Sequence, residues 1–201
     1  MSTTSRREPR RGRRPGAPDT RAAILHAART AFAAKGFSGT TIRSVAADAE
    51  VDAALVHHYF GTKDDLFVAA MELPIDPRQV IAEVVASGPD GAGERLLRAF
   101  LSVWDDEAMG SVLVATVRSA LEPCGERLLS QGFVPVVLVP AGAALGIDRP
   151  EVRMPLLATQ VLGLILTRYL FRLEPIASMD ADALVAAYAP SFQRFLTGDI
   201  G

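Results

Sequence analysis

Residues 41–60 constrain the fold of this 201-residue chain more than any other stretch. Thr40 or Thr41 can cap a segment in which Val45 and Ala49 recur at helical spacing, and Asp52 can cap a second short segment, AALVHHYF. Thr and Asp are favoured N-caps because their side-chain oxygens accept hydrogen bonds from free backbone N–H groups. The stretch therefore predicts two short helices joined by a tight turn, which is the spacing of a helix-turn-helix.

The small and apolar residues of this stretch also fit such a motif. Ala46 is expected where the two helices cross, Val51 plugs the turn, and Val56 and Tyr59 close the far side. This packing would hold the second helix rigid, so that its exposed face could enter a DNA major groove. A plain helical hairpin remains the alternative from these residues alone.

The rest of the chain is also expected to be helical. Asp19 or Thr20 can cap a helix that runs to about residue 35, where Gly36 follows as a left-handed C-cap. We find no strand alternation and no internal repeat, so the fold class is all-α. Further helices are expected at residues 62–72, 77–87, 91–105, 107–121, 123–131, 134–146, 149–173 and 179–197.

Charge is distributed unevenly along the chain. Residues 1–63 hold eleven Lys or Arg and five Asp or Glu, a net +6, whereas residues 64–201 hold ten and eighteen, a net −8. Residues 1–18 are rich in Arg, Pro and Gly without apolar periodicity, which predicts a disordered basic arm. The basic half favours a polyanionic partner, with a mere basic tail as the alternative.

Several protein classes are disfavoured by composition. The one cysteine, Cys124, excludes an intramolecular disulfide framework and fits a cytoplasmic protein. Apolar runs fall short of the ~20 residues that a membrane span needs. The glycine-rich stretch GPDGAGE follows no strand and lacks a phosphate-binding Lys, and we find no catalytic motif. The sequence therefore predicts no enzyme, cofactor, metal or membrane partner.

Two stretches, AAKGFSGTTIRSVA and HHYFGTKDDLF, carry a resemblance to a known family. With the residues around them, at about 19–67, they resemble the DNA-binding domain of the TetR family of bacterial transcriptional regulators. The resemblance implies an N-terminal three-helix DNA-binding domain at 19–66 and a C-terminal helical domain for ligand binding and dimerisation at 67–201. It also implies a homodimer on an inverted-repeat operator in double-stranded DNA, released by a small-molecule effector.

The adjacent histidines His57 and His58 fit DNA contacts better than catalysis or metal binding. Neighbours on a helix point about 100° apart, so one metal ion cannot easily take both. A catalytic histidine needs a nucleophile and an orienting carboxylate, and neither is evident. The resemblance places His57 where relatives usually have a phosphate-contacting tyrosine, with His58 as a second backbone contact. A solvent-facing histidine without a role remains the alternative for each.

Other DNA contacts are implied by the same resemblance. Thr41 and Lys63 match phosphate contacts, and Arg43 matches a base-contacting position. The start of the recognition helix, Ala53, Ala54 and Leu55, matches positions that touch base edges, where apolar side chains can meet a thymine methyl.

One departure from the family pattern is Glu50. The resemblance places a glycine at this corner, where the backbone tends to be left-handed. A non-glycine residue in that conformation costs about 1 kcal/mol, so we expect Glu50→Gly to stabilise the fold.

The C-terminal half offers candidates for a ligand pocket and for a dimer interface, although each residue also fits an ordinary core. The helix at 149–173 has two apolar stripes, so it must be covered on two faces. One of these stripes, with residues of the last helix, predicts a dimer interface of Leu157, Val161, Leu164, Arg168, Phe171, Leu184, Tyr188 and Phe192. An apolar or amphipathic effector is expected to meet Phe100, Trp104, Met109, Phe133, Gln160, Thr167 and Tyr169.

Two rival functions come from other classes. A small all-α enzyme with a buried pocket would need an acid or base that the sequence does not offer. A helical interaction module would use only its basic arm to bind acidic partners. The sequence favours a ligand-responsive DNA-binding regulator, most often a repressor in this family.

Overall fold

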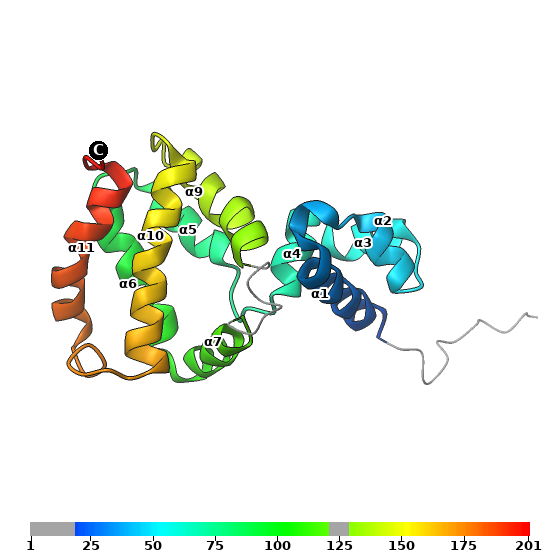
Figure 1. Ribbon diagram of the computed structural model, residues 1–201, viewed down its shortest axis with the longest axis horizontal. Coiled ribbons are helices and arrows are strands. Elements are labelled where there is room, and N and C mark those ends of the chain that lie inside the picture. Colours follow the sequence, from blue (N-terminus) through cyan, green and yellow to red (C-terminus); the bar gives the residue numbers. More distant parts are fainter. Residues whose placement is uncertain (1–18, 121–128) are drawn as a thin grey trace, which may run out of the picture.

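The computed structural model describes residues 19–120 and 129–201, and over these ranges it contains helices and connecting loops without any strand (Figure 1). The all-α prediction is therefore confirmed. The basic arm and most of the helix expected at 123–131, with Cys124, lie outside the described residues. The elements are α1 (Thr20–Gly39), α2 (Ile42–Asp48), α3 (Ala53–Phe60), α4 (Lys63–Ala70), α5 (Pro77–Ala86), α6 (Ala92–Trp104), α7 (Glu107–Ala120), η1 (Leu129–Leu138), α9 (Val139–Ala144), α10 (Pro150–Leu164), η2 (Ile165–Leu170) and α11 (Ala181–Thr197).

The first four helices form one body with its own core (Figure 1). Phe32 of α1 and Phe67 of α4 are fully buried and meet edge to face, with ring centroids 5.2 Å apart. Phe37 contacts both rings. Such aromatic pairs add about 1 kcal/mol beyond their buried area. This core holds α1 and α4 together and so supports α2 and α3.

The segment η1 joins that first core from the C-terminal half of the chain. Val136 and Val137 are buried against it. Gly132 approaches Phe67 so closely that a Cβ at this position would lie 2.2 Å from the ring carbon Cζ. The two halves of the molecule are therefore packed against each other through η1, α1 and α4.

Helices α5, α6, α9, α10 and α11 share a second core, in which α6 packs along α11. Leu97, Leu184 and Phe192 are fully buried there. Gly93 permits the close approach, since a Cβ would lie 2.6 Å from the backbone nitrogen of Gln193. In Figure 1, α10 crosses in front of α6 and beside α11.

Some helix boundaries differ from the sequence-based ones. Gly36 breaks α1 with φ 68°, as expected, but helical turns resume as far as Gly39. The helix expected at 149–173 is α-helical only to Leu164 and then becomes the π-helical η2. The helix expected at 134–146 begins earlier, as the π-helical η1 with Pro135 inside it. Proline lacks an N–H and clashes with the carbonyl of an ordinary α-turn, so a wider turn there has a physical cause.

Candidate DNA-binding interface

The caps of α2 and α3 fix the two helices at the expected positions. Thr41 Oγ1 accepts from the backbone N–H of Ser44 at 3.0 Å, and Ser44 Oγ accepts from that of Thr41 at 3.1 Å. Asp52 Oδ1 accepts from the N–H of Ala54 at 2.7 Å. Each bond satisfies a donor that the helix itself leaves free. The hydroxyl of Thr41 keeps its own hydrogen for a further acceptor.

The turn between the helices has the left-handed corner that the sequence suggested. Glu50 has φ 55°, and Val51 donates its N–H to the carbonyl of Ala46 at 2.9 Å. Ala46 is buried where α2 meets α3, as expected for a crossing that excludes larger side chains. The strain at Glu50 is thus retained in a well-packed turn.

The two faces of α3 are clearly separated. Val56 and Phe60 are buried in the first core, whereas Ala54, His57 and His58 are exposed. The expectation that Tyr59 closes the core is wrong, because Tyr59 is 43% exposed and its neighbour Phe60 takes that place. The residue one position further along a helix is turned by about 100°, which the apolar pattern alone did not resolve.

The predicted DNA-contact residues lie on or beside this exposed surface. Thr41, Arg43, Ala54, His57 and His58 are exposed, while the other three, Ala53, Leu55 and Lys63, are half-buried. Nδ1 of His57 lies 2.8 Å from the carbonyl oxygen of Gly61. Arg43 is exposed and forms no ion pair within the described ranges.

Lys63 is held more firmly than an ordinary surface lysine. Its Nζ lies over the ring of Phe37, 4.1 Å from the centroid. Partial burial lowers the pKa of the Lys63 ammonium, against the opposing effect of the Asp64 carboxylate. The charge of Lys63 is therefore fixed near the start of α4, where a phosphate contact is predicted.

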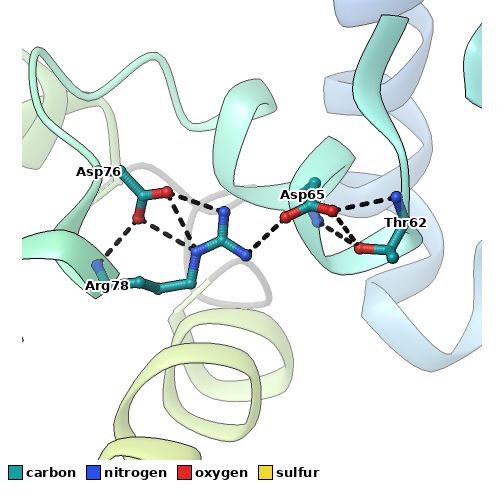
Figure 2. A network of polar contacts seen from close by, with 4 residues as sticks. All are labelled: Thr62, Asp65, Asp76 and Arg78. Atoms are coloured by element: carbon teal, nitrogen blue, oxygen red, sulfur yellow. Dashed lines mark hydrogen bonds and ion pairs between the residues drawn. The ribbon is translucent and has the colours of Figure 1, made fainter. Parts of the chain in front are cut away.

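A polar network joins this region to the C-terminal half (Figure 2). Its capping box was expected from the sequence, but the link to Arg78 was not. Thr62 and Asp65 form a capping box at the start of α4, with Oγ1 of Thr62 donating to Oδ2 of Asp65 at 2.5 Å. Nη1 of Arg78 donates to the other carboxylate oxygen of Asp65 at 2.8 Å. Arg78 also donates through Nη2 to Asp76, the N-cap of α5, at 2.8 Å. Arg78 thus ties the first turn of α4 to α5.

The charges in this network stabilise one another. Hydrogen bonds from Thr62, and then from Arg78, hold the pKa of Asp65 below its usual range. Hydrogen bonds from Arg78 lower the pKa of Asp76, and its two carboxylate partners raise the pKa of Arg78. The Asp-Pro-Arg sequence at 76–78 marks the cap of α5, but nothing in it indicates Asp65 as a partner thirteen residues earlier.

Three of the seven predicted pocket residues lie together. The rings of Phe100 and Trp104 stack with centroids 5.4 Å apart, and Tyr169 lies 5.1 Å from Trp104 and 6.1 Å from Phe100. The Tyr169 hydroxyl donates to Asp105 at 2.9 Å. Burial raises the pKa of this phenol. We call these three aromatic residues the Trp104 cluster.

The other four predicted pocket residues are not joined to this cluster by any ring contact or side-chain hydrogen bond in the described part of the chain. Phe133 packs against the first core. Thr167 donates to the carbonyl of Gly163 at 2.8 Å. Met109 and Gln160 are half-buried on α7 and α10. A separate open cavity of about 490 Å³ lies among α1, α3, α4 and α5, and its described lining includes none of the seven.

The predicted dimer-interface stripe needs correction. Leu157, Leu164, Leu184 and Phe192 are at most 2% exposed, because they pack in the second core of their own protomer. Val161 and Tyr188 pack against the same core, and Arg168 donates to the carbonyls of Ile176 and Met179. Of the eight residues, Phe171 is the exposed one, at 60%.

The second predicted stripe of the same helix, Leu156, Thr159, Gly163, Leu166 and Leu170, faces outward in part, because its first three residues are exposed and its last two are half-buried. Val152, Leu156 and Leu162 of α10 are exposed, together with Gly163. Helical periodicity revealed both stripes but held no information on which would meet the protomer's own core. We call Val152, Leu156, Leu162 and Phe171 the outer α10 face.

The described residues offer neither a metal site nor a membrane-spanning helix. No group of three or more His, Cys, Asp or Glu side chains there could hold a metal ion. No helix in those ranges is long and apolar enough to cross a bilayer.

This architecture is that of a helix-turn-helix protein with a helical C-terminal domain, and comparisons with known proteins identify the family. Residues 24–70 match the model for bacterial regulatory proteins of the tetR family. Residues 90–196, about half of the chain, match the tetracyclin repressor-like C-terminal domain. The chain belongs to the TetR family of bacterial regulatory proteins, and the matched models are those of regulators rather than enzymes.

Individual relatives agree with this assignment. The HTH-type transcriptional repressor Rv3405c of Mycobacterium tuberculosis is 35% identical over 92 residues, which cover 43% of this chain and 49% of the relative. The regulator BetI of Burkholderia thailandensis is 32% identical over 97 residues, which cover 48% of this chain and 50% of the relative. The chain thus spans about half the length of the curated relatives it matches. Among solved structures, a TetR-family regulator from Streptomyces coelicolor A3 is 39% identical. The match covers 92% of this chain and 98% of the regulator's chain, with a TM-score of 0.46.

Proposed function

We propose that this protein is a homodimeric repressor that binds an inverted-repeat operator and leaves it when a small molecule binds the C-terminal domain. The observation that carries the proposal is the exposed face of α3, held rigid by the caps and the turn described above. A recognition helix must be fixed in this way because base contacts tolerate little movement.

Base recognition would rest mainly on Arg43 and on apolar contacts from α3. Arg43 is exposed and unpaired within the described residues, so its guanidinium is free for a guanine edge. Ala53, Ala54 and Leu55 would meet thymine methyl groups. Thr41, His57, His58 and Lys63 would contact phosphates, which set register rather than sequence.

Dimerisation would use the outer α10 face. Its side chains are apolar and exposed, with Val152, Leu156 and Leu162 on α10 and Phe171 directly after η2. Clusters of this kind on a soluble protein mark an interaction surface. A two-fold interface would place two α3 helices about 34–36 Å apart, in successive major grooves.

Effector binding would act through the Trp104 cluster and α4. Three aromatic rings with one half-buried phenol favour an apolar or amphipathic aromatic ligand. A ligand that displaces these rings can shift α4 only if it binds the released form more tightly. The contacts of Arg78 with Asp65 and of η1 with Phe67 join α4 to the C-terminal half.

The test begins with selection of random duplexes by the full-length protein and titration of the selected sequences by fluorescence anisotropy. An inverted repeat bound far more tightly than scrambled DNA is the expected result. Arg43→Ala should relax preference at one base pair and cost about 1–3 kcal/mol. Arg98→Ala is the matched control, because Arg98 pairs with Glu94 and Asp182 in the C-terminal half.

A variant that lacks residues 1–18 separates the regulator from the interaction module. The regulator should keep its sequence preference with a weaker salt dependence, since fewer counterions are released. Binding that ignores sequence and disappears with the arm would refute the proposal. Trp104 is the only tryptophan of the chain, so a change in its fluorescence would report an effector that enters the cluster.

A further inference from the structure

The hydrogen bond of His57 fixes which of its ring nitrogens is engaged by the protein itself. Nδ1 lies 2.8 Å from the carbonyl oxygen of Gly61, four residues further along the chain. Gly61 ends α3 with φ 77°, a backbone conformation that glycine adopts without strain. Both residues are exposed. The ring is therefore anchored to the backbone at Nδ1, and Nε2 is the nitrogen left for a ligand.

The anchor also fixes the position of the proton. A carbonyl oxygen can only accept, so the nitrogen that meets it must carry the hydrogen. A neutral imidazole has one N–H, which leaves Nε2 as a bare acceptor. Phosphate oxygens at neutral pH are acceptors as well. Neutral His57 can therefore keep its bond to Gly61 or donate to a phosphate, but it cannot do both.

We propose that His57 binds the operator backbone as an imidazolium, donating from Nδ1 to Gly61 and from Nε2 to a phosphate, so that DNA binding takes up a proton at each His57. This inference rests on the proposed operator binding. A tyrosine at the same position would donate from its hydroxyl throughout the physiological pH range. A histidine whose Nδ1 is bonded to Gly61 donates to the phosphate only when it is protonated, so the contact depends on pH.

The described residues around His57 do not supply a carboxylate that pairs with its imidazolium. No ion pair joins His57 to any described residue, and it stands in the last turn of α3, where carbonyl groups accommodate a cation. The counter-charge must then come from the DNA. Charged residues on α3, on the helices packed against it and in the adjoining turn are Asp52, Arg43, Asp48, Glu50, Lys63, Asp64, Asp65 and Arg21.

His58 provides a matched control on the same helix. Its ring lies edge-on to Tyr59, with centroids 5.7 Å apart, and no described hydrogen bond anchors either nitrogen. Neutral His58 can therefore turn either tautomer toward a phosphate and donate without taking up a proton. Removing His58 should weaken binding without changing how binding depends on pH.

The experiment measures affinity of the full-length protein for its selected duplex at constant ionic strength, between about pH 6 and about pH 8, the range in which histidine changes charge. As the pH rises over this range, wild-type affinity should fall about tenfold for each His57 that loses its proton and its phosphate contact. This is the change expected for the loss of one charge-assisted hydrogen bond. His57→Phe should bind weakly with a flat profile, and His57→Tyr should also be flat. His58→Phe should keep the wild-type slope.

Two results would overturn the inference while leaving the regulator proposal intact. One is sequence-specific binding by the wild type that does not change with pH. The other is a slope that persists in His57→Phe. Nitrogen NMR of the free protein gives an independent readout, in which neutral His57 should carry its proton on Nδ1 and not on Nε2. Failure to bind any duplex with sequence preference, at every pH and in every variant, would instead refute the proposed function.

Discussion

Replacement of Glu50 by glycine tests the strained corner of the helix-turn-helix. Glu50 has φ 55°, and this left-handed conformation costs a non-glycine residue about 1–2 kcal/mol. Glycine escapes that cost but loses more backbone freedom on folding, which offsets about 0.5–1 kcal/mol. The side chain of Glu50 is exposed and forms no ion pair within the described residues, so its removal sacrifices little else. The net expectation is a gain of roughly 0.5–1 kcal/mol.

The matched control is Glu50→Ala, which removes the same carboxylate but keeps a Cβ in the left-handed conformation. The two variants should therefore differ by the backbone effect alone. Chemical denaturation of both proteins measures the difference in unfolding free energy. In thermal unfolding the same difference corresponds to roughly 1–4 °C for a chain of this size.

The reasoning would fail if Glu50→Gly were no more stable than Glu50→Ala. That result would mean that the turn in solution does not hold residue 50 at positive φ. Equal gains in both variants over the wild type would point to charge repulsion rather than strain. DNA affinity should rise equally in the two variants, since both remove a negative charge beside the recognition helix.

Two further predictions follow from arginine side chains that join elements distant in the sequence. Arg78→Ala should lower the unfolding free energy by about 1 kcal/mol at neutral pH, because it leaves Asp65 and Asp76 without their partly exposed cation. Both carboxyls have lowered pKa values in the folded state, so the wild-type advantage should be present above about pH 4 and vanish as the pH falls further, as denaturation at several pH values would show. Arg153→Met should cost about 1–3 kcal/mol, measured in the same way against Arg149→Met, because the buried Arg153 donates to the carbonyl of Phe195 near the end of α11 and to that of the C-cap Gly198, at 3.1 and 2.9 Å.

The local elements of this fold were predictable from short-range chemistry. Asp52 caps α3 where the sequence placed it, and α2 is capped by Thr41, one of the two threonines that the sequence offered. Gly36 and Gly61 interrupt or end helices at positive φ. Caps and left-handed glycines act over a few residues, so their signals survive without knowledge of the partner elements. The left-handed corner at Glu50 was foreseen on another ground, the family resemblance, which places a glycine there.

The candidate site was foreseen less completely. The exposed face of α3 emerged because its buried side, Val56 and Phe60, follows helical periodicity. The exchange of roles between Tyr59 and Phe60 did not, since neighbouring aromatic residues give the same apolar signal. The anchor of His57 on Gly61 also needed coordinates, because sequence shows a nearby carbonyl but not its direction.

The sequence by itself determined an all-helical chain, the boundaries of its helix-turn-helix and the family to which it belongs. Tertiary structure decided which faces meet. It turned Leu157 and Leu164 into the protomer's own core and left Leu156 outside. It also brought Arg78 to Asp65 and Gly132 to Phe67, contacts between segments that share no local signal. The physical reason is that periodicity reports only that a helix face is apolar, whereas its partner is selected by the packing of all the helices together.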